Sequence, residues 1–403
     1  MKKLPFLLLL YSMLLYLFWC CDNAEPNGEP PNPTNGEYSA DILSYNYAIG
    51  TQTIGPSYGL TDETRLVETA SRILEMGSNI LKITLDPSSY GLIYNHTYSH
   101  QLLENESSFR KIMNMDFNYY FFWVYAPRVD VAWRDGLSPT ESFNEYDNMY
   151  KLADYLLKNF NGKNKKFYLG HWEGDWHLVD NFNAGQRNVS AERIQGMIDW
   201  YNIRQKAIDD ARAANTGSDV EVYHYVEVNR VLDAVNLNYD RVTNKVLPFS
   251  NVDYVSYSSY DVTWNASNAS TMRGNLRGAL NYIEQQLKPK GNIEGKRVFI
   301  GEYGYPAKSH NEANQDAYSR LVMKYALEWG CPFVLYWEMY NNEVENGQQV
   351  GYWLIDNNGN KKKVYCTHRN FYEDMKKYVS DFKNEKGKLP SHDEFNAMAV
   401  SKL

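Results

Sequence analysis

The sequence predicts a (β/α)8 barrel, and three observations lead to that fold class. Short apolar runs typical of buried parallel strands alternate with amphipathic stretches along most of the chain. Eight such runs lie between Tyr47 and Val379, so each βα unit would average ~42 residues, within the range of this fold. Two of the runs end in a glutamate, at Glu173 and Glu302, which are 129 positions apart. This spacing places the two carboxylates three strands apart at the same end of the barrel.

The length and composition fit one large domain. The chain has 403 residues, 43% of them hydrophobic and 22% charged, which is ordinary for a globular protein. The net charge of −8 and the absence of a basic stripe in the sequence argue against nucleic acid as a partner. Aromatic residues reach 15%, with 34 Tyr and 10 Trp. Their flat apolar faces and polar tips suit sugar rings as well as protein cores.

Residues 1–20 predict a signal peptide for export. Two lysines precede an apolar run to Trp19 that is too short for a comfortable membrane span. The end of this run resembles a bacterial lipoprotein processing site, and we expect Cys21 to carry the lipid anchor. The bulky Phe18 and Trp19 depart from the usual pattern, so uncleaved anchoring and simple secretion remain alternatives.

Residues 21–40 predict a flexible tether between this anchor and the barrel. They are rich in Pro, Asn, Gly and Glu, a composition that cannot form a core. The protein is therefore expected to be exported and held at the bacterial cell surface or on the periplasmic side of a membrane. The barrel is expected to occupy residues 41–380, and residues 381–403 read as a polar tail of unknown order.

The predicted strands are short runs rich in Val, Ile, Tyr, Phe and Trp. They cover residues 47–54, 80–85, 119–125, 167–172, 221–226, 252–257, 298–301 and 333–337. Helical patterns lie between them, and Gly77 is expected to end the first helix as a C-cap. The predicted helices cover residues 61–76, 142–160, 191–213, 271–287 and 315–329.

Cys331 and Cys366 are the only cysteines beyond the signal region. In an exported protein they could pair with each other. No further cysteine pattern supports a disulfide framework, so isolated buried thiols are the expectation.

Three of the strand ends carry motifs that resemble a known clan of enzymes. The fourth run ends in His-Trp-Glu-Gly-Asp around Glu173, the seventh reads Ile-Gly-Glu-Tyr-Gly around Glu302, and the eighth ends at Trp337. Together they resemble the clan A retaining glycoside hydrolases with (β/α)8 barrels, also called the four-over-seven superfamily. The resemblance implies that Glu173 is the acid/base, Glu302 the nucleophile and Trp337 the floor of a sugar site. It reaches the clan and no particular family.

The clan's chemistry requires an ionised nucleophile. Glu302 has to attack the anomeric carbon, and a cation beside it would lower its pKa. Lys82 lies in the second strand, in a segment where the clan normally carries Arg, and it is expected to supply that cation. A phenol from Tyr257 or Tyr260, at the end of the sixth strand, is expected to donate to the same carboxylate.

The proton donor requires the opposite environment. Glu173 has to be protonated when the leaving oxygen departs, so we expect apolar walls from Trp172 and Trp176 to raise its pKa. The clan usually places Asn immediately before this glutamate, and here Trp172 holds that position. His171 and Asp175 are expected to contact substrate hydroxyls or to fix Glu173.

Further polar residues and two alternatives complete the sequence-based prediction. His224 on the fifth strand is expected to line the mouth of the site, with Glu227 just beyond it. His171, Glu173, Asp175 and His177 alternate as metal ligands could, but no second His or Cys cluster completes such a site, so no metal and no cofactor are predicted. The expected activity is retaining hydrolysis of a β-linked polysaccharide or oligosaccharide. A non-catalytic carbohydrate-binding lipoprotein is the first alternative and a metal-dependent hydrolase the second, while oligomeric state stays open.

Overall fold

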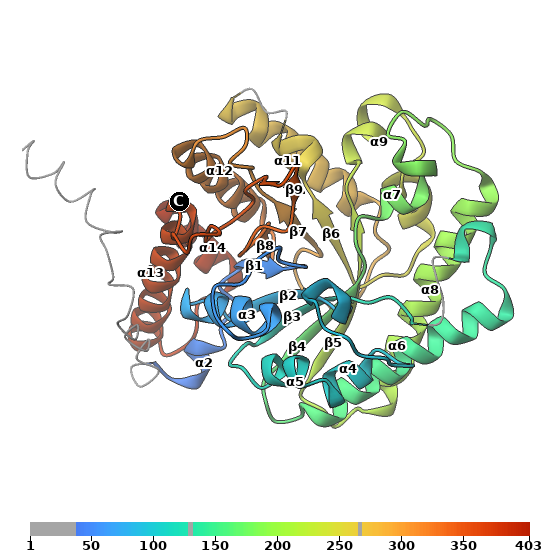
Figure 1. Cartoon of the computed structure of the whole chain (residues 1–403), viewed down its shortest axis with the longest axis horizontal. Helices are drawn as coiled ribbons and strands as arrows, with labels where there is room; N and C mark the ends of the chain where they lie inside the picture. Colours follow the sequence, from blue (N-terminus) through green and yellow to red (C-terminus); the bar gives the residue numbers. More distant parts are fainter. Residues whose placement is uncertain (1–37, 128–131, 265–267) are drawn as a thin grey trace, which may run out of the picture.

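Eight parallel strands close into a barrel in the order β1 to β8 (Figure 1). The computed structural model describes residues 38–403 apart from 128–131 and 265–267, so the predicted signal peptide and most of the predicted tether lie outside the described residues. The strands are β1 (Ile49–Thr53), β2 (Ile80–Thr84), β3 (Tyr119–Trp123), β4 (Lys166–Gly170), β5 (Glu221–Val228), β6 (Tyr254–Ser258), β7 (Val298–Tyr303) and β8 (Val334–Tyr336). The predicted (β/α)8 barrel is confirmed.

Aromatic side chains fill the interior of the barrel. Phe121 and Tyr168 stack with ring centroids 4.4 Å apart, and Tyr225 and Phe299 pack beside them at 5.6 Å from each other. Gly170 on β4 makes room for this layer, because a Cβ at that position would lie 2.3 Å from the Tyr225 ring. Large rings on alternate positions therefore leave the residues between them to face the helices.

The helices surround the barrel (Figure 1), and the five predicted ones are present with shifted ends. They are α3 (Arg65–Glu75), α6 (Pro139–Asn159), α8 (Ala191–Ala214), α11 (Ala269–Gln285) and α12 (Glu312–Trp329). Helix α6 begins earlier than predicted, because Ser138 and Glu141 form a capping box around Pro139. In the described part of the chain, no helix combines the length and apolar character needed to cross a membrane.

Shorter helices and one hairpin lie between these elements along the chain. The helices are α2 (Ala40–Leu43), α4 (His100–Asn105), α5 (Ser107–Met113), α7 (Gly174–Leu178), α9 (Val231–Leu237) and α10 (Tyr260–Thr263). A hairpin of β9 (Val344–Glu345) and β10 (Gln348–Gln349) follows β8. Helix α7 starts directly after Glu173, so the predicted acid lies where a strand passes into a helix.

The C-terminal segment differs from the predicted polar tail. Helix α13 (Lys363–Lys386) runs across the expected boundary at residue 380, and α14 (His392–Lys402) follows it. Phe395 of α14 is completely buried, with its ring centroid 5.2 Å from Tyr45 and 6.1 Å from Tyr47. The apolar residues of this helix do not gather on one helical face in the sequence, which is why its packing was not predicted. Residues 381–403 pack as part of the barrel domain.

The two cysteines of the domain do not pair with each other. Cys331 is a free and completely buried thiol, and burial raises its pKa. Cys366 is disulfide-bonded. The expectation of an isolated thiol therefore fits Cys331 and is wrong for Cys366.

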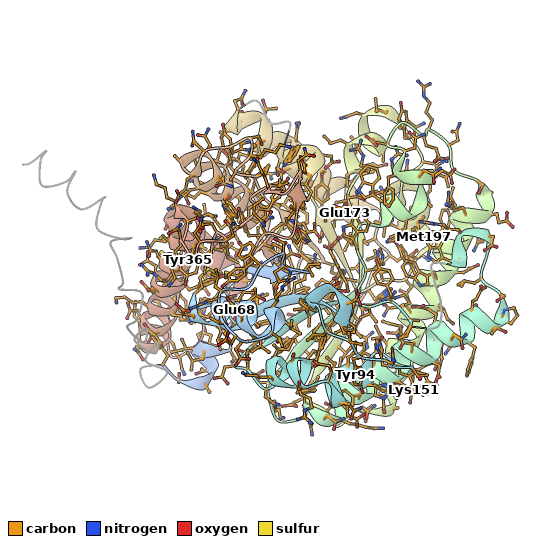
Figure 2. All side chains as sticks on the ribbon, in the orientation of Figure 1. Glu68, Tyr94, Lys151, Glu173, Met197 and Tyr365 are labelled. Carbon is orange, nitrogen blue, oxygen red and sulfur yellow. The ribbon has the colours of Figure 1, made fainter. Side chains whose placement is uncertain are left out.

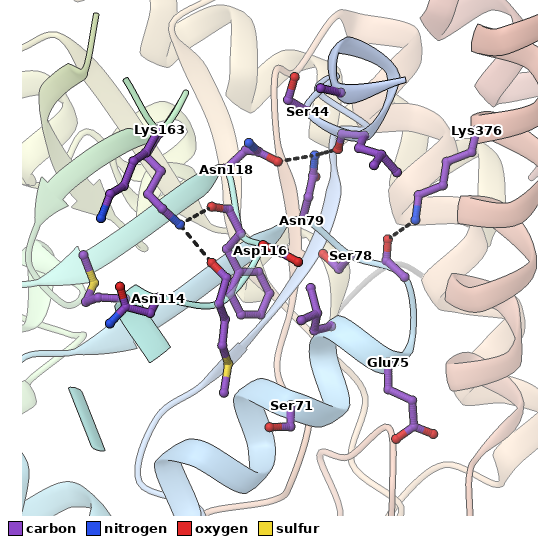
Figure 3. Close-up of a pocket in the computed structure, with 18 residues that line it drawn as sticks. Ser44, Ser71, Glu75, Ser78, Asn79, Asn114, Asp116, Asn118, Lys163 and Lys376 are labelled. Carbon is purple, nitrogen blue, oxygen red and sulfur yellow. Dashed lines mark hydrogen bonds between the residues drawn. The ribbon is translucent and has the colours of Figure 1, made fainter. Parts of the chain in front are cut away.

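The N-terminal end of the barrel holds a cavity of about 1000 Å³ (Figure 3). Its polar side chains bind backbone carbonyls around it: Lys165 Nζ donates to Phe117 O at 2.8 Å, and Lys376 Nζ donates to Gly77 O at 2.9 Å. Asn79 Nδ2 donates to Leu43 O at 3.0 Å. These bonds tie the loops below the strands together, and the two predicted catalytic glutamates lie elsewhere.

Candidate active site

A second cavity, of about 540 Å³, lies at the C-terminal ends of the strands, where (β/α)8 barrels build their sites. Glu173, which lines it, is labelled in Figure 2. The lining residues come from strand ends and the loops that follow them. They are Ile54, Trp123, Trp172, Glu173, Tyr260, Trp264, Glu302, Trp337, Asn342, Glu343 and Tyr352.

Lys82 is the buried cation beneath this cavity. It points inward from β2, and its side chain is completely buried. Its Nζ lies 3.2 Å from Glu302 Oε1 and 3.2 Å from Glu227 Oε2, and it donates to Gly301 O at 3.1 Å. The structure therefore brings Lys82 and Glu302 together. The same ammonium is shared with a second carboxylate.

Glu302 reaches the cavity because β7 is irregular at this point. Phe299 and Gly301 face the barrel interior, so strict alternation would turn Glu302 toward the helices. The pairing of β7 with β6 and with β8 shifts register here. Such an irregularity redirects a side chain, and it is common beside functional sites. Glu302 consequently lines the cavity together with Glu173.

Glu173 is held by contacts from β5 and its following loop. Its backbone N–H donates to Glu227 Oε1 at 3.0 Å, and its own Oε2 accepts from Asn229 Nδ2 at 3.2 Å. Gly174 follows it closely packed, since a Cβ there would lie 2.8 Å from Glu227 O. These contacts fix both the backbone and the carboxyl group of the predicted acid.

Glu227 lies at the centre of the arrangement. It is completely buried on β5, on the same inward face as Tyr225. It accepts hydrogen bonds from Glu173 N, from Lys82 Nζ and, at 2.7 Å, from Ser256 Oγ. From the sequence it was only one of several polar residues near the mouth. Its inward position could have been inferred from its period-2 spacing after Tyr225.

The two predicted catalytic carboxyls are both harder to ionise than free glutamate. Burial, followed by the charges of Glu302 and Glu227, raises the pKa of Glu173 well above its ordinary value. The pKa of Glu302 is raised to about 8: burial is the largest cause, Lys82 acts in the opposite direction, and Glu227 adds to the rise. Lys82 lowers the pKa of Glu302, as expected, but desolvation and the third carboxylate outweigh the cation, so the net pKa is raised.

The two predicted histidines lie outside the cavity lining. His171 and His224 alternate with the inward-facing Tyr168 and Tyr225 and so face the helix layer. The His171 ring packs 5.1 Å from the ring of Tyr201 on α8, and His224 is completely buried on the same side. Burial lowers the pKa of both rings, so they are neutral packing residues.

Asp175 and Tyr257 also lie outside the cavity lining. Asp175 accepts backbone N–H bonds from Asn229 at 2.9 Å and Val242 at 2.8 Å, which fixes the loop after β5. The Tyr257 hydroxyl donates to Asp261. Tyr260 is therefore the phenol of the predicted pair that lines the cavity with Glu302.

Tryptophans form much of the cavity wall. Trp172, Trp337 and Trp123 line it, and the last two rings lie 6.1 Å apart with an interplanar angle of 31°. Trp176 does not line the cavity and lies beneath the Arg230 guanidinium at 5.4 Å. Its side chain is hydrogen-bonded to Glu173 and lowers the pKa of that carboxyl, so the expectation that Trp176 raises this pKa is wrong.

Several site residues were missed from the sequence. Trp123 is the last residue of β3, but the apolar run continues through Val124 and Tyr125, so the sequence does not mark Trp123 as the strand end. The others lie in loops, where no periodic pattern marks them: Asn229, Trp264, Asn342, Glu343 and Tyr352.

The possible metal site at the fourth strand end does not assemble. His171 faces α8, and His177 Nε2 lies 3.2 Å from the Tyr125 hydroxyl. Among the residues that the structure describes, no group of three or more His, Cys, Asp or Glu side chains is arranged to hold a metal ion.

The fold and the carboxylate-lined cavity define a (β/α)8-barrel protein with a site at the C-terminal ends of its strands. Neither a protein-family model nor a curated protein sequence matches the chain. Solved structures share its fold. GH5_18 from Bifidobacterium longum subsp. longum, in complex with Manβ1-4GlcNAc, is 16% identical, with 81% of this chain and 78% of that chain covered and a TM-score of 0.55.

Two further structures have similar values. The exo-β-1,4-mannosidase Op5Man5 from Opitutaceae bacterium strain TAV5 is 13% identical over 82% of this chain and 60% of its own, with a TM-score of 0.55. The GH5-4 broad specificity endoglucanase from Clostridium acetobutylicum is 14% identical over 80% of this chain and 96% of its own, with a TM-score of 0.51. At these identities the likeness establishes the fold.

Proposed function

We propose that this protein is a retaining glycoside hydrolase that cleaves an uncharged, β-linked polysaccharide or oligosaccharide. The observation that carries the proposal is the single cavity lined by Glu173 from the end of β4, Glu302 from β7 and tryptophans on its walls. Two carboxyl groups facing one sugar site are what glycosidic bond cleavage requires. The mannosidase and the endoglucanase that share the fold support this choice of reaction.

The reaction would proceed in two displacements. In the first, Glu302 attacks the anomeric carbon, the bond to the leaving oxygen breaks, and Glu173 gives its proton to that oxygen. In the second, Glu173 takes a proton from water as the water oxygen attacks the same carbon and releases Glu302. Two inversions return the product to its original configuration.

The charge of the cavity wall favours neutral sugars. Glu173, Glu302 and Glu343 line the cavity, while the described lining residues include no Lys, Arg or His. Lys82 lies beneath them and is neutralised by carboxylates. Turnover requires an ionised Glu302, so a uronic acid or sulfated sugar would meet a like charge in a desolvated site, which is costly. Stacking on Trp337 and hydrogen bonds to carboxyl groups suit an uncharged pyranose.

We expect the purified protein to release reducing sugar from at least one of β-mannan, β-glucan and xylan, and from neither polygalacturonate nor alginate. Proton NMR of the first product formed should show the β-anomer before mutarotation. Saturable binding of these glycans without any turnover would instead identify a carbohydrate-binding protein. Activity that disappears with a chelator and returns with a divalent metal would identify a metal-dependent hydrolase.

The pH dependence follows from the two carboxyl groups. Turnover needs an ionised Glu302, whose pKa is about 8, and a protonated Glu173, whose pKa is also raised. We therefore expect kcat/KM to rise by about tenfold per pH unit on the acidic side and to level off near pH 8. Initial rates between pH 5 and pH 10 on one soluble substrate measure this. A plateau that begins below pH 6 would contradict the assigned ionisation of Glu302.

We also propose that Cys21 carries a lipid that anchors the protein at a membrane surface, a proposal supported by the N-terminal sequence alone. Cys21→Ala should move the full-length chain from the membrane fraction to the soluble fraction, and mass spectrometry should find diacylglycerol on Cys21 of the parent. Cys331 is free and Cys366 is disulfide-bonded, so a Cys21–Cys366 disulfide and a lipid on Cys21 exclude each other. Peptide mapping without reduction, in the same experiment, decides between them. An unmodified Cys21 in the membrane fraction would rule out this anchor.

A further inference from the structure

We infer that Glu227 is the permanent counter-ion of Lys82 and positions both proposed catalytic carboxyl groups, a role that rests on the proposed function. Glu227 does not line the cavity, so it is a positioning residue and does not itself touch substrate. No expectation drawn from the sequence assigned it this role. The two carboxylates beside Lys82, Glu227 and Glu302, differ in the hydrogen-bond donors that reach them.

The contacts of Glu227 are those of an ionised carboxylate. Its Oε1 accepts from the backbone N–H of Glu173 at 3.0 Å. Its Oε2 accepts from Ser256 Oγ at 2.7 Å and from Lys82 Nζ at 3.2 Å. All three partners are placed as donors, and hydrogen bonds to the charged form of a carboxylate stabilise that form. A fourth contact is a side-chain hydrogen bond between Glu227 and Glu302, which raises the pKa of Glu302. Glu227 thereby links β2, the end of β4 and β6.

Glu302 has fewer hydrogen-bond donors than Glu227. Lys82 Nζ is its side-chain donor in the described structure, at 3.2 Å, and this donor is shared. One cation cannot fully compensate two buried carboxylates. Glu227, which has more hydrogen-bond donors, therefore stays ionised and pairs with the Lys82 ammonium. Glu302 is the carboxyl group that gains and loses its negative charge.

This division of roles suits a two-step displacement. When the Glu302 oxygen bonds to the anomeric carbon, the carboxylate becomes an ester and its negative charge disappears, while the departing oxygen takes the proton of Glu173. A lysine whose only partner was Glu302 would then be buried without a counter-ion, which is strongly destabilising. Glu227 keeps Lys82 paired while the covalent intermediate exists.

The ionisation of Glu302 also depends on the other groups around it. Coulombic contributions to the carboxyls of this cluster come from elements on every side of the cavity. The titratable and charged groups are Lys82 on β2, Glu173 after β4, Tyr225 and Glu227 on β5, Tyr260 on α10 and Glu338 after β8. Lys82 is the cation of this set. When the negative charge of Glu227 is removed, Lys82 is expected to stabilise the ionised form of Glu302 alone.

The test is a carboxyl titration that requires no substrate. Protein labelled with ¹³C at the glutamate carboxyl carbon is titrated by NMR, and Glu302→Gln assigns the Glu302 signal by its loss. In Glu227→Gln the Glu302 midpoint should fall by about one pH unit or more, a tenfold or greater gain in its ionisation constant. The matched control is Glu145→Gln, which removes a buried carboxylate 3.3 Å from Arg204 in the helix layer, and it should leave the midpoint unchanged. An unchanged or higher midpoint in Glu227→Gln overturns the inference.

A second comparison covers the case in which Glu227→Gln does not fold. Lys82→Met leaves its partner carboxylate buried without a cation. A second substitution that replaces this carboxylate with an amide should therefore restore stability. Lys82→Met with Glu227→Gln should melt at a higher temperature than Lys82→Met with Glu302→Gln. The reverse order overturns the pairing. Absence of hydrolysis by the parent would refute the proposed function and leave both of these measurements able to decide the role of Glu227.

Discussion

Glu302→Gln should abolish turnover for every substrate and every leaving group. An amide does not form the glycosyl-enzyme, so neither displacement can proceed, and a loss on the order of 10⁴-fold or more is expected. The substitution is nearly isosteric and preserves a hydrogen-bonding group beside Lys82. Initial rates on the natural glycan and on an activated aryl glycoside measure the loss. Comparable rates for variant and parent on either substrate would remove Glu302 from the role of nucleophile.

The same variant should be more stable than the parent at neutral pH. Burial raises the pKa of Glu302 from 4.5 to about 8. Its contribution to stability is therefore fully present below pH 4.5 and is lost as the pH rises through about 8. Gln does not titrate, so its advantage in Tm should be absent near pH 4 and reach a few degrees by pH 8. Glu302→Gln with lost activity and a lower Tm at pH 8 would instead point to a damaged fold.

Glu173→Gln should lose activity in a way that depends on the leaving group. Proton donation contributes typically 10²- to 10⁴-fold, so natural glycans with poorly activated leaving oxygens should be affected by about that factor. An aryl glycoside with an acidic phenol needs little protonation, and its first step should be affected much less. Glycosyl-enzyme should then accumulate, because the base for the second step is also missing.

Azide provides the decisive measurement on this variant. The small anion can reach the glycosyl-enzyme without a general base, because the Glu173 carboxylate charge is no longer present to repel it. Turnover of the aryl glycoside should rise with azide concentration and yield a β-glycosyl azide from a β-linked substrate, identified by NMR. His171→Gln, in the helix layer outside the cavity lining, is the matched control and should show no azide dependence. An α-azide product, or rescue of the control as well, would contradict the assigned roles.

The sequence was sufficient for the barrel and for the candidate carboxylates because both leave strong local signals. An acidic residue directly after an apolar run, such as Glu173 or Glu302, indicates a strand end that carries a functional side chain. Which face each side chain takes was harder to predict. His224 and Tyr257 were assigned to the mouth, yet period-2 alternation turns them toward the helices. The sequence did not show which residues of their strands face the barrel interior, so the facing of these two could not be inferred.

The remaining differences have two physical causes. Glu302 faces inward only because β7 shifts register beside it, and a local irregularity of this kind has no signature in residue order. Glu343 and Asn229 lie in loops whose course depends on tertiary contacts, so their place at the site could not be inferred. The net effect on the Glu302 pKa was also beyond sequence reasoning, since it required knowing that Glu227 shares Lys82.

Helix α2 lies near the start of the described chain, at the end of the barrel opposite the candidate active site. Ala40 and Leu43 lie against the cavity at the N-terminal end of the barrel, whereas Glu173 and Glu302 open at the far end of the same strands. If Cys21 is anchored as proposed, the tether joins the barrel at the end opposite the sugar site. Long glycans could then approach the tryptophan-lined mouth without the lipid surface obstructing either end of the polymer.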